Sequence, residues 1–395
     1  MAIRQGIKRR IVGLMAVTIP SLITVYLAFQ RHSSVFSRTG RDRQRIDHRA
    51  ITDHPLHNCS CYMSYIRSHG GSIGGPELEV DDKSSVKTNS TQFLTPSKPS
   101  NEYIATPAVE SPKNYLQEPI DKHLFNYIHN PERTCFHENG TEIDVFLVFF
   151  VLSAPSNFEQ RDAIRRSYGM RDTWPSTGGG QVVAVFLLAS TSKPELQEKI
   201  DTESTNHGDI VQETFVDSYL NLTRKTIMGL KWVKNHCRHA KFVMKIDDDT
   251  SVIQPRLLTI LRNANHTNYT LGHVFKEPIV MRNKKNKFYL SKEYYPDNHF
   301  PSYPVGHGYV MTTDVVDAAF NVAVTIPLFP WEDVFFGTCL QKLNIHLNHD
   351  TDFFFWGKYT ALLTGNVKTI SSKHVIATDI PPKDMVRFYQ RFVMT

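Results

Sequence analysis

The chain has 395 residues, of which 41% are apolar, and a formal net charge of +6 at pH 7. This apolar fraction is too low for a membrane-embedded bundle, and the length allows one large domain of about 250 residues beside a sizeable tail. The basic residues are spread along the chain, and no zinc-finger, basic-zipper or RNA-recognition signature accompanies them. We therefore expect no nucleic-acid partner.

Residues 11–29 form a stretch without a charged residue that is just long enough to cross a bilayer as a helix. A cleaved signal peptide is the alternative, but no small-x-small cleavage site follows the stretch. Long domains translocate largely regardless of flanking charge. We therefore expect a cytoplasmic tail at residues 1–10, an uncleaved anchor at 11–29 and a lumenal remainder, the arrangement of a single-pass type II membrane protein.

Residues 30–133 are rich in Ser, Pro, His, Gly and charged residues and show little apolar periodicity. This composition predicts a flexible lumenal stalk, because such a segment cannot bury enough apolar surface to offset the entropy of ordering. The remaining residues, 134–395, are expected to form the globular domain.

Glycosylation signals and cysteines agree with a lumenal location. Six Asn-x-Ser/Thr sequons are present, at Asn58, Asn89, Asn139, Asn221, Asn265 and Asn268. The five cysteines are an odd number, which in an oxidising compartment leaves a free thiol or an intermolecular bridge. Cys59 and Cys61, in the stalk, are the candidates for linking two chains into a homodimer.

Apolar runs alternate with helical patterns in the globular region. We expect strands at 144–152, 181–189, 209–212 and 242–246, and helices at 157–168, at 195–206 and from residue 217 or 218 onward. Strands that alternate with helices predict an α/β fold, with a mostly parallel sheet flanked by helices.

The run at 242–246 ends directly in Asp247, Asp248 and Asp249. In open α/β sheets, ligands bind at the carboxyl ends of the strands. Three adjacent carboxylates repel one another, and their hard oxygen atoms suit Mg²⁺ or Mn²⁺. A solvated acidic turn is the alternative interpretation, which the strand directly in front of the triplet makes weaker.

Three further groups of residues are candidates, each with a structural alternative. Arg161 and Arg165 lie four positions apart on one helical face, where planar guanidinium groups suit a diphosphate or form a solvated basic face. Glu332 and Asp333 begin an apolar helix, where acids are often only caps and dipole partners. His374 is isolated in the sequence, and such a histidine is more often structural than a ligand.

Six segments together resemble the β1,3-galactosyltransferases and β1,3-N-acetylglucosaminyltransferases, which are Golgi type II membrane enzymes that use nucleotide sugars. The segments are RDAIRRSYG (161–169), VFLLAS (185–190), DIVQETFVDSYLNLTRKTIMGLKWV (209–233), FVMKIDDDTSV (242–252), YPVGHGYVMT (303–312) and EDVFFGTCL (332–340). The resemblance covers roughly residues 143–380. It implies a GT-A type Rossmann-like domain, a UDP-sugar donor, a glycan acceptor, a divalent ion that is usually Mn²⁺, and inversion at the anomeric carbon.

The chain departs from the family pattern at two places. Ser167 and Tyr168 stand where the family usually has Thr-Trp, and the run from Val305 to Gly308 replaces a more usual small-residue, glycine-rich run. His307 within this run bears on the fit of the donor sugar or the acceptor.

The resemblance also assigns roles to residues of the domain at 134–395, which it identifies as the catalytic glycosyltransferase domain. Asp333 matches the family's general base, and Asp249 and His374 match its metal ligands. The expected donor-binding residues are Arg161, Arg165, Lys245, Asp247 and Asp248. The expected reaction transfers a hexose or an N-acetylhexosamine from the UDP-sugar to the acceptor in β1,3 linkage, in the Golgi lumen.

Two other functions fit parts of the sequence. One is an inactive, lectin-like or scaffold ectodomain of the same fold, which would not need a base such as Asp333. The other is a different metal-dependent enzyme, such as a nucleotidyltransferase or a phosphatase, which would not explain the anchor, the stalk and the sequons. Mn²⁺-dependent hydrolysis or transfer of a UDP-sugar distinguishes the three.

Overall fold

A computed structural model of the chain describes residues 114–170, 174, 180–354 and 357–393. The expected cytoplasmic tail and anchor, Cys59 and Cys61, and most of the expected stalk lie outside these residues. Within the described ranges, no helix is both long and apolar enough to cross a membrane.

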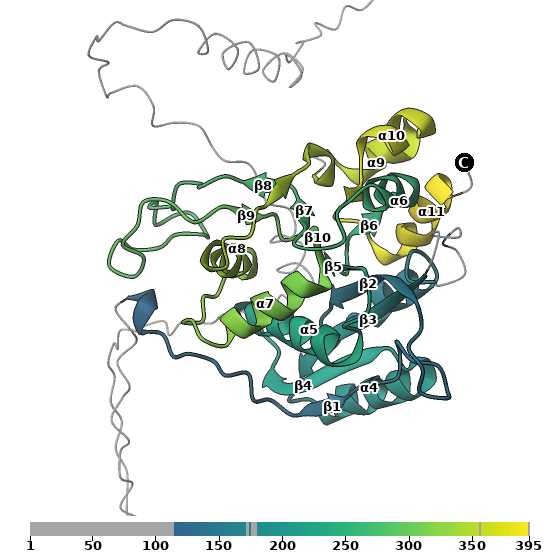
Figure 1. Ribbon diagram of the computed structural model, residues 1–395, viewed down its shortest axis with the longest axis horizontal. Coiled ribbons are helices and arrows are strands. Elements are labelled where there is room, and N and C mark those ends of the chain that lie inside the picture. Colours follow the sequence, from purple (N-terminus) through teal and green to yellow (C-terminus); the bar gives the residue numbers. More distant parts are fainter. Residues whose placement is uncertain (1–113, 171–173, 175–179, 355–356, 394–395) are drawn as a thin grey trace, which may run out of the picture. The chain divides into compact units, whose positions relative to one another are not determined.

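An eight-stranded sheet forms the centre of the domain, with the strand order β1-β4-β3-β2-β5-β10-β7-β11 (Figure 1). Four of the neighbouring pairs are parallel and the pairs β1–β4, β5–β10 and β10–β7 are antiparallel, so the prediction of a mostly parallel sheet is confirmed. In chain order the strands are β1 (Tyr127–His129), β2 (Val145–Leu152), β3 (Gln181–Ser190), β4 (Ile210–Val216), β5 (Phe242–Asp247), β7 (Thr270–Gly272), β10 (Gly308–Thr312) and β11 (Asn348–His349).

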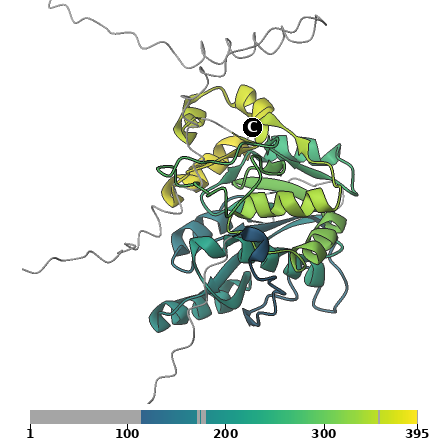
Figure 2. The ribbon, with the colours of Figure 1, turned by 90° about the vertical axis from the view of Figure 1, so that its left-hand side faces the viewer.

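Helices cover both faces of this sheet (Figures 1 and 2). One face packs against α3 (Phe158–Arg165), α4 (Pro194–His207), α6 (Gln254–Arg262), α9 (Tyr359–Thr364), α10 (Val367–Lys373) and α11 (Pro382–Val393). The other face packs against α5 (Leu222–His236), α7 (Thr313–Ala323) and α8 (Glu332–Lys342). Side chains of β2 alternate between the two cores, with Phe149 in the first and Phe150 in the second. This double burial explains the almost continuous apolar run.

Two short ladders extend the structure beyond the main sheet. Strands β6 (Ser251–Val252) and β12 (Ile376–Ala377) pair antiparallel, as do β8 (Val274–Phe275) and β9 (Tyr303–Pro304). Three single 3₁₀ turns, η1 (Tyr115–Gln117), η3 (Tyr219–Asn221) and η4 (Thr351–Phe353), complete the described elements.

A third apolar cluster lies at the beginning of α8. It contains Trp331, which directly precedes the helix, together with Phe300 and Phe329. The described end of the expected stalk packs here, because the ring of Tyr115 stacks on Tyr295 with 4.7 Å between the centroids. The first turn of α8, which carries Glu332 and Asp333, is therefore held in place by packed aromatic rings.

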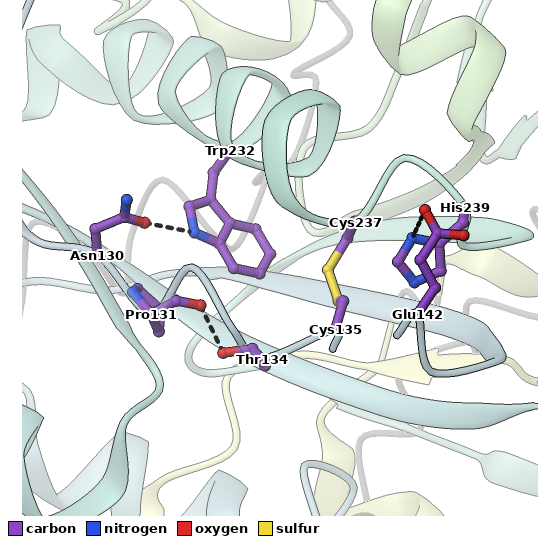
Figure 3. The surroundings of a disulfide bond; sticks show 8 residues. All are labelled: Asn130, Pro131, Thr134, Cys135, Glu142, Trp232, Cys237 and His239. Atoms are coloured by element: carbon purple, nitrogen blue, oxygen red, sulfur yellow. Dashed lines mark hydrogen bonds and ion pairs between the residues drawn. A yellow bond between two sulfur atoms is a disulfide. The ribbon is translucent and has the colours of Figure 1, made fainter. Parts of the chain in front are cut away.

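A disulfide joins Cys135, which precedes β2, to Cys237 at the end of α5 (Figure 3). Beside it, the indole N–H of Trp232 donates a hydrogen bond to Oδ1 of Asn130 at 3.1 Å. Among the cysteines that the structure describes, Cys339 is left as a free, buried thiol.

We expect loss of this disulfide to lower the free energy of unfolding. The two cysteines are separated by 102 positions, and a cross-link that closes a long loop stabilises a domain by about 2–5 kcal/mol. Denaturant unfolding of the double variant Cys135→Ala/Cys237→Ala measures the loss. Wild-type protein unfolded in the presence of a reductant is the matched comparison, and an unchanged unfolding midpoint in both would contradict the prediction.

Candidate active site

The acidic triplet lies at the carboxyl edge of the sheet, where the parallel strands β2 and β5 end side by side. Leu152 is the register partner of Asp247, so the residues that follow β2 approach the triplet. The hydroxyl of Ser153 donates to Oδ2 of Asp248 at 2.7 Å, and the amide of Asn157 donates to the same oxygen at 2.9 Å. Two neutral donors thus fix this carboxylate without neutralising its charge.

Arg161 supports the loop that carries these donors. Its fully buried guanidinium pairs with Glu203 at 2.6 Å, and its Nη1 atom donates to the Ala154 carbonyl at 2.7 Å and to the Ser153 hydroxyl at 3.2 Å. Arg165 also contacts Glu203, at 2.7 Å, and pairs with Asp209 at 2.8 Å. Both guanidinium groups are thus engaged by carboxylates, and Arg161 reaches the acidic triplet through Ser153.

Lys245 connects the triplet to the beginning of α8. Its side chain is buried on β5, and its ammonium group lies 2.7 Å from Oδ1 of Asp247 and 3.4 Å from Oε2 of Glu332. The ammonium group also donates to the carbonyl of Gly306. A single buried cation therefore brings together three segments that are far apart in the sequence.

Asp333 lies next to this network, at the first turn of α8. A Cβ atom added at Gly306 would lie 3.6 Å from Oδ2 of Asp333, so the absence of a side chain at residue 306 leaves room in front of the carboxylate. Burial raises the pKa of Asp333 to about 7, and the negative charge of Glu332 adds to this effect. Burial also raises the pKa of Asp247 to about 6, although the Lys245 ammonium opposes the shift.

The segment around His307 lies beside the end of β5, next to the acidic triplet. The backbone N–H of Asp247 donates to the His307 carbonyl at 3.2 Å, and a Cβ atom at Gly308 would lie 3.1 Å from the Met244 methyl group. Burial lowers the pKa of His307 to about 3, with a further contribution from the Lys245 charge, so its imidazole is neutral at pH 7. Gly306 thus lies close to the carboxylates of α8, and Gly308 lies close to the neighbouring strand β5.

The two expected metal ligands, Asp249 and His374, flank the short β6–β12 ladder. Ile253 donates its N–H to the Val375 carbonyl at one end of the β6–β12 ladder, and Ile380 donates to the Asp249 carbonyl at the other end. His374 is therefore at the end of the ladder opposite Asp249, where it senses the charge of Asp352. The described part of the chain contains no cluster of three or more His, Cys, Asp or Glu residues able to hold a metal ion.

The carboxylates of the triplet still fit a divalent ion that is shared with a ligand. Asp247, Asp248 and Asp249 are all partly exposed, and they offer the hard oxygen atoms that Mg²⁺ and Mn²⁺ prefer. Such ions are commonly bound by one or two carboxylates together with phosphate oxygens of a substrate, and do not require a cage made of protein ligands.

Several residues of this site were not among those predicted from the sequence. Ser153 and Asn157 follow the carboxyl end of β2 as the triplet follows that of β5, so the adjacency of these strands was the available signal. Tyr309 had no such signal. Its hydroxyl donates to Oε1 of Glu332 at 2.7 Å, and this contact joins residues that are 23 positions apart in the sequence.

Comparison with known proteins identifies the family. The model of the family described as Galactosyltransferase matches residues 159–351. The chain is 36% identical to β-1,3-galactosyltransferase 5 of Pan paniscus over 235 residues, which are 59% of this chain and 75% of that protein. It is 30% identical to β-1,3-galactosyltransferase 1 of Mus musculus over 309 residues, which are 76% of this chain and 92% of that protein.

A solved structure of the WbbM bifunctional glycosyltransferase aligns with 63% of this chain and 52% of its own, at 12% identity. The TM-score of this alignment is 0.32. The fold and the acidic sheet edge, together with the curated relatives, define a glycosyltransferase. The chain belongs to the galactosyltransferase family, as its sequence motifs predicted.

We expect Arg161→Met to destabilise the domain by about 3–5 kcal/mol, because the substitution removes one partner of a buried ion pair. Arg166→Met is the matched control, since Arg166 pairs with Asp162 at 2.7 Å where both side chains are more than half exposed. Such a surface pair contributes at most about 1 kcal/mol. Denaturant unfolding compares the two variants, and equal losses would show that Arg161 does not support the loop.

Proposed function

We propose that this protein is an inverting β1,3-glycosyltransferase, which transfers a hexose or an N-acetylhexosamine from a UDP-sugar to a hydroxyl group of a glycan. The observation that carries the proposal is the network in which Lys245 joins Asp247 to the first turn of α8, beside Asp333. A donor-binding carboxylate and a candidate base are thereby held at one edge of the sheet. We also propose that the α/β domain is of the GT-A type.

The proposed chemistry uses Asp333 as a general base. The acceptor oxygen attacks the anomeric carbon, the bond between that carbon and the UDP oxygen breaks, and Asp333 takes the proton of the acceptor hydroxyl. Attack from the face opposite to UDP inverts the anomeric configuration. A base is most effective when its pKa lies near the working pH, and burial raises the pKa of Asp333 to about 7.

The acidic triplet would serve the donor. Asp249 would hold a divalent ion such as Mn²⁺, which when bound would supply Lewis-acid stabilisation of the charge that develops on the departing UDP. Asp248, held by Ser153 and Asn157, and Asp247, held by Lys245, would contact the donor's ribose or sugar or the water shell of the ion. Arg161, which holds Ser153, and Arg165, which shares Glu203 with it, would complete the donor side, and His374 would be the second protein ligand of the ion.

The proposed setting is the Golgi membrane, with residues 11–29 as a type II anchor and the domain in the lumen. The exposure of Asn139, Asn265 and Asn268 supports N-glycosylation at these sequons. The side chain of Asn221 instead donates to the Val216 carbonyl at 2.8 Å and accepts from Arg224, so this sequon is less accessible.

The direct test is a transfer assay with the full-length protein and Mn²⁺. UDP-galactose, UDP-N-acetylglucosamine and UDP-N-acetylgalactosamine are each offered with acceptors that end in galactose, N-acetylglucosamine or mannose. We expect transfer from one of these donors, with a β1,3 linkage in the product. Acceptor binding without transfer or hydrolysis of any donor would instead support the inactive, lectin-like alternative.

We expect Asp249→Ala to abolish the binding of UDP that depends on Mn²⁺. Loss of this carboxylate leaves the charge of the ion and the diphosphate without its protein ligand. Calorimetric titration of UDP with and without Mn²⁺ measures the effect. His374→Ala is tested in parallel, and we expect a smaller loss because His374 lies at the opposite end of the β6–β12 ladder. Unchanged UDP affinity in Asp249→Ala would show that the ion binds elsewhere or is not used.

We expect Asp333→Asn to lower the rate of transfer by about 10²-fold or more, the range for losing a general base. UDP affinity and the free energy of unfolding should stay near those of the wild type, because the amide preserves the shape of the side chain. Glu332→Gln is the matched comparison, and we expect a milder loss of kcat. Full turnover in Asp333→Asn, together with an inactive Glu332→Gln variant, would reverse the two assignments.

A further inference from the structure

Glu332 is held by two strands of the sheet and is not only an acid at a helix end. The hydroxyl of Tyr309, on β10, donates to its Oε1 atom at 2.7 Å, and the Lys245 ammonium, on β5, lies 3.4 Å from its Oε2 atom. Asp333 behaves differently, because its Oδ1 atom accepts the backbone N–H of Val334 at 2.8 Å. The Glu332 carboxylate is thus held by side chains of two strands, whereas the Asp333 carboxylate is held by the backbone of its own helix.

Tyr309 is a rigid donor for this contact. Its side chain is buried, and its ring stacks on Phe336 of α8 with 4.6 Å between the centroids and 17° between the planes. Burial and the neighbouring carboxylate of Glu332 raise the pKa of Tyr309 well above its usual value. The hydroxyl therefore keeps its proton and remains available as a donor to Glu332.

The carboxylates of Glu332 and Asp333 face the same place. A Cβ atom added at Gly306 would lie 3.5 Å from Oε2 of Glu332 and 3.6 Å from Oδ2 of Asp333. Adjacent residues of a helix point about 100° apart. The contacts with Tyr309 and Lys245 explain why the Glu332 carboxylate nevertheless lies close to the Asp333 carboxylate. The negative charge of Glu332 is therefore kept close to the candidate base.

We propose that Glu332, fixed by Tyr309 and Lys245, is a positioning residue that sets the pH range in which Asp333 accepts the proton of the acceptor. The proposal rests on the proposed function, in which Asp333 is the general base. Among the described residues, the charged groups that act on Asp333 are Glu332 on its own helix and Lys245 on β5. Tyr309 on β10 is affected by the charge of Asp333, and Asp247 is linked to this group through Lys245. Of these, Glu332 opposes the ionisation of Asp333 and Lys245 favours it.

The sign of the expected effect follows from this arrangement. A base acts as the carboxylate, so kcat/KM falls as the pH decreases through the pKa of the base in the free enzyme. A neighbouring negative charge raises that pKa, and Glu332→Gln removes the charge while keeping the shape of the side chain. The acid limb of the profile should therefore move to lower pH, by about one unit.

Tyr309→Phe provides a second variant that leaves the carboxylate in place. It removes one oxygen atom and preserves the stack on Phe336, but it releases Glu332 from its bond on β10. We expect the acid limb to move in the same direction as in Glu332→Gln, by a smaller amount. A helix-capping role for Glu332 would change stability in these variants without moving the pH profile.

Tyr294→Phe is the matched control, because the Tyr294 hydroxyl donates to Oε1 of Glu118 at 3.0 Å, in a tyrosine–glutamate bond that does not involve α8. The full-length wild type and the three variants are assayed from pH 5 to 9 with the active donor, and UDP affinity is measured in parallel to check the donor site. We expect Tyr294→Phe to reproduce the wild-type profile.

Two outcomes overturn the inference, and they can be distinguished. If the wild type transfers sugar and both Glu332→Gln and Tyr309→Phe keep its acid limb, then Glu332 does not tune the base and the proposed function stands. If the wild type transfers sugar from no UDP donor, the proposed function fails, and the inference fails with it.

Discussion

The arrangement of the site depends on the burial of a single ammonium group. A buried cation is costly unless it is paired and hydrogen-bonded, and the acceptors around Lys245 are supplied by Asp247, Gly306 and Glu332. These residues come from the end of β5, from the loop before β10 and from the first turn of α8. The requirement to satisfy one charge therefore fixes the position of the acidic triplet relative to the candidate base.

A second buried cation has the same effect on the other side of the triplet. Arg161 is paired with Glu203 and holds Ser153, whose hydroxyl in turn fixes Asp248. Arginine suits this position because its planar group can bind a carboxylate and the loop atoms at the same time. Two of the three carboxylates, those of Asp247 and Asp248, are therefore oriented by side chains of the protein itself, before any ligand binds.

The local pattern of the sequence was sufficient to predict the elements on which the site is built. An apolar run that ends in Asp247 predicts a buried strand with acids at the sheet edge, and the apolar pattern after Asp333 predicts α8. The contacts between these elements could not be predicted in the same way. Tyr309 lies opposite Lys245 because β10 pairs antiparallel with β5, and neither propensity nor periodicity determines that register.

His374 shows the same limitation. Its assignment as a metal ligand followed from the order of motifs, but its position is determined by the two-residue ladder between β6 and β12. In this register, Ala377 lies opposite Ser251, and the chain that continues past β12 brings the Ile380 N–H to the Asp249 carbonyl. A shift of a few residues in so short a ladder would change which side chain approaches the triplet, and the sequence contains no signal that specifies it.

The division between buried and exposed groups explains how such a site can act on a charged ligand. Lys245, Tyr309 and His307 are buried, whereas Asp247, Asp249 and Asp333 are partly exposed. The charges and dipoles that orient the carboxylates are thus placed where water does not screen them, and the carboxylates themselves remain accessible from outside the protein. Fixed groups of this kind need little reorganisation during a reaction, which is the property that makes electrostatic stabilisation in enzymes effective.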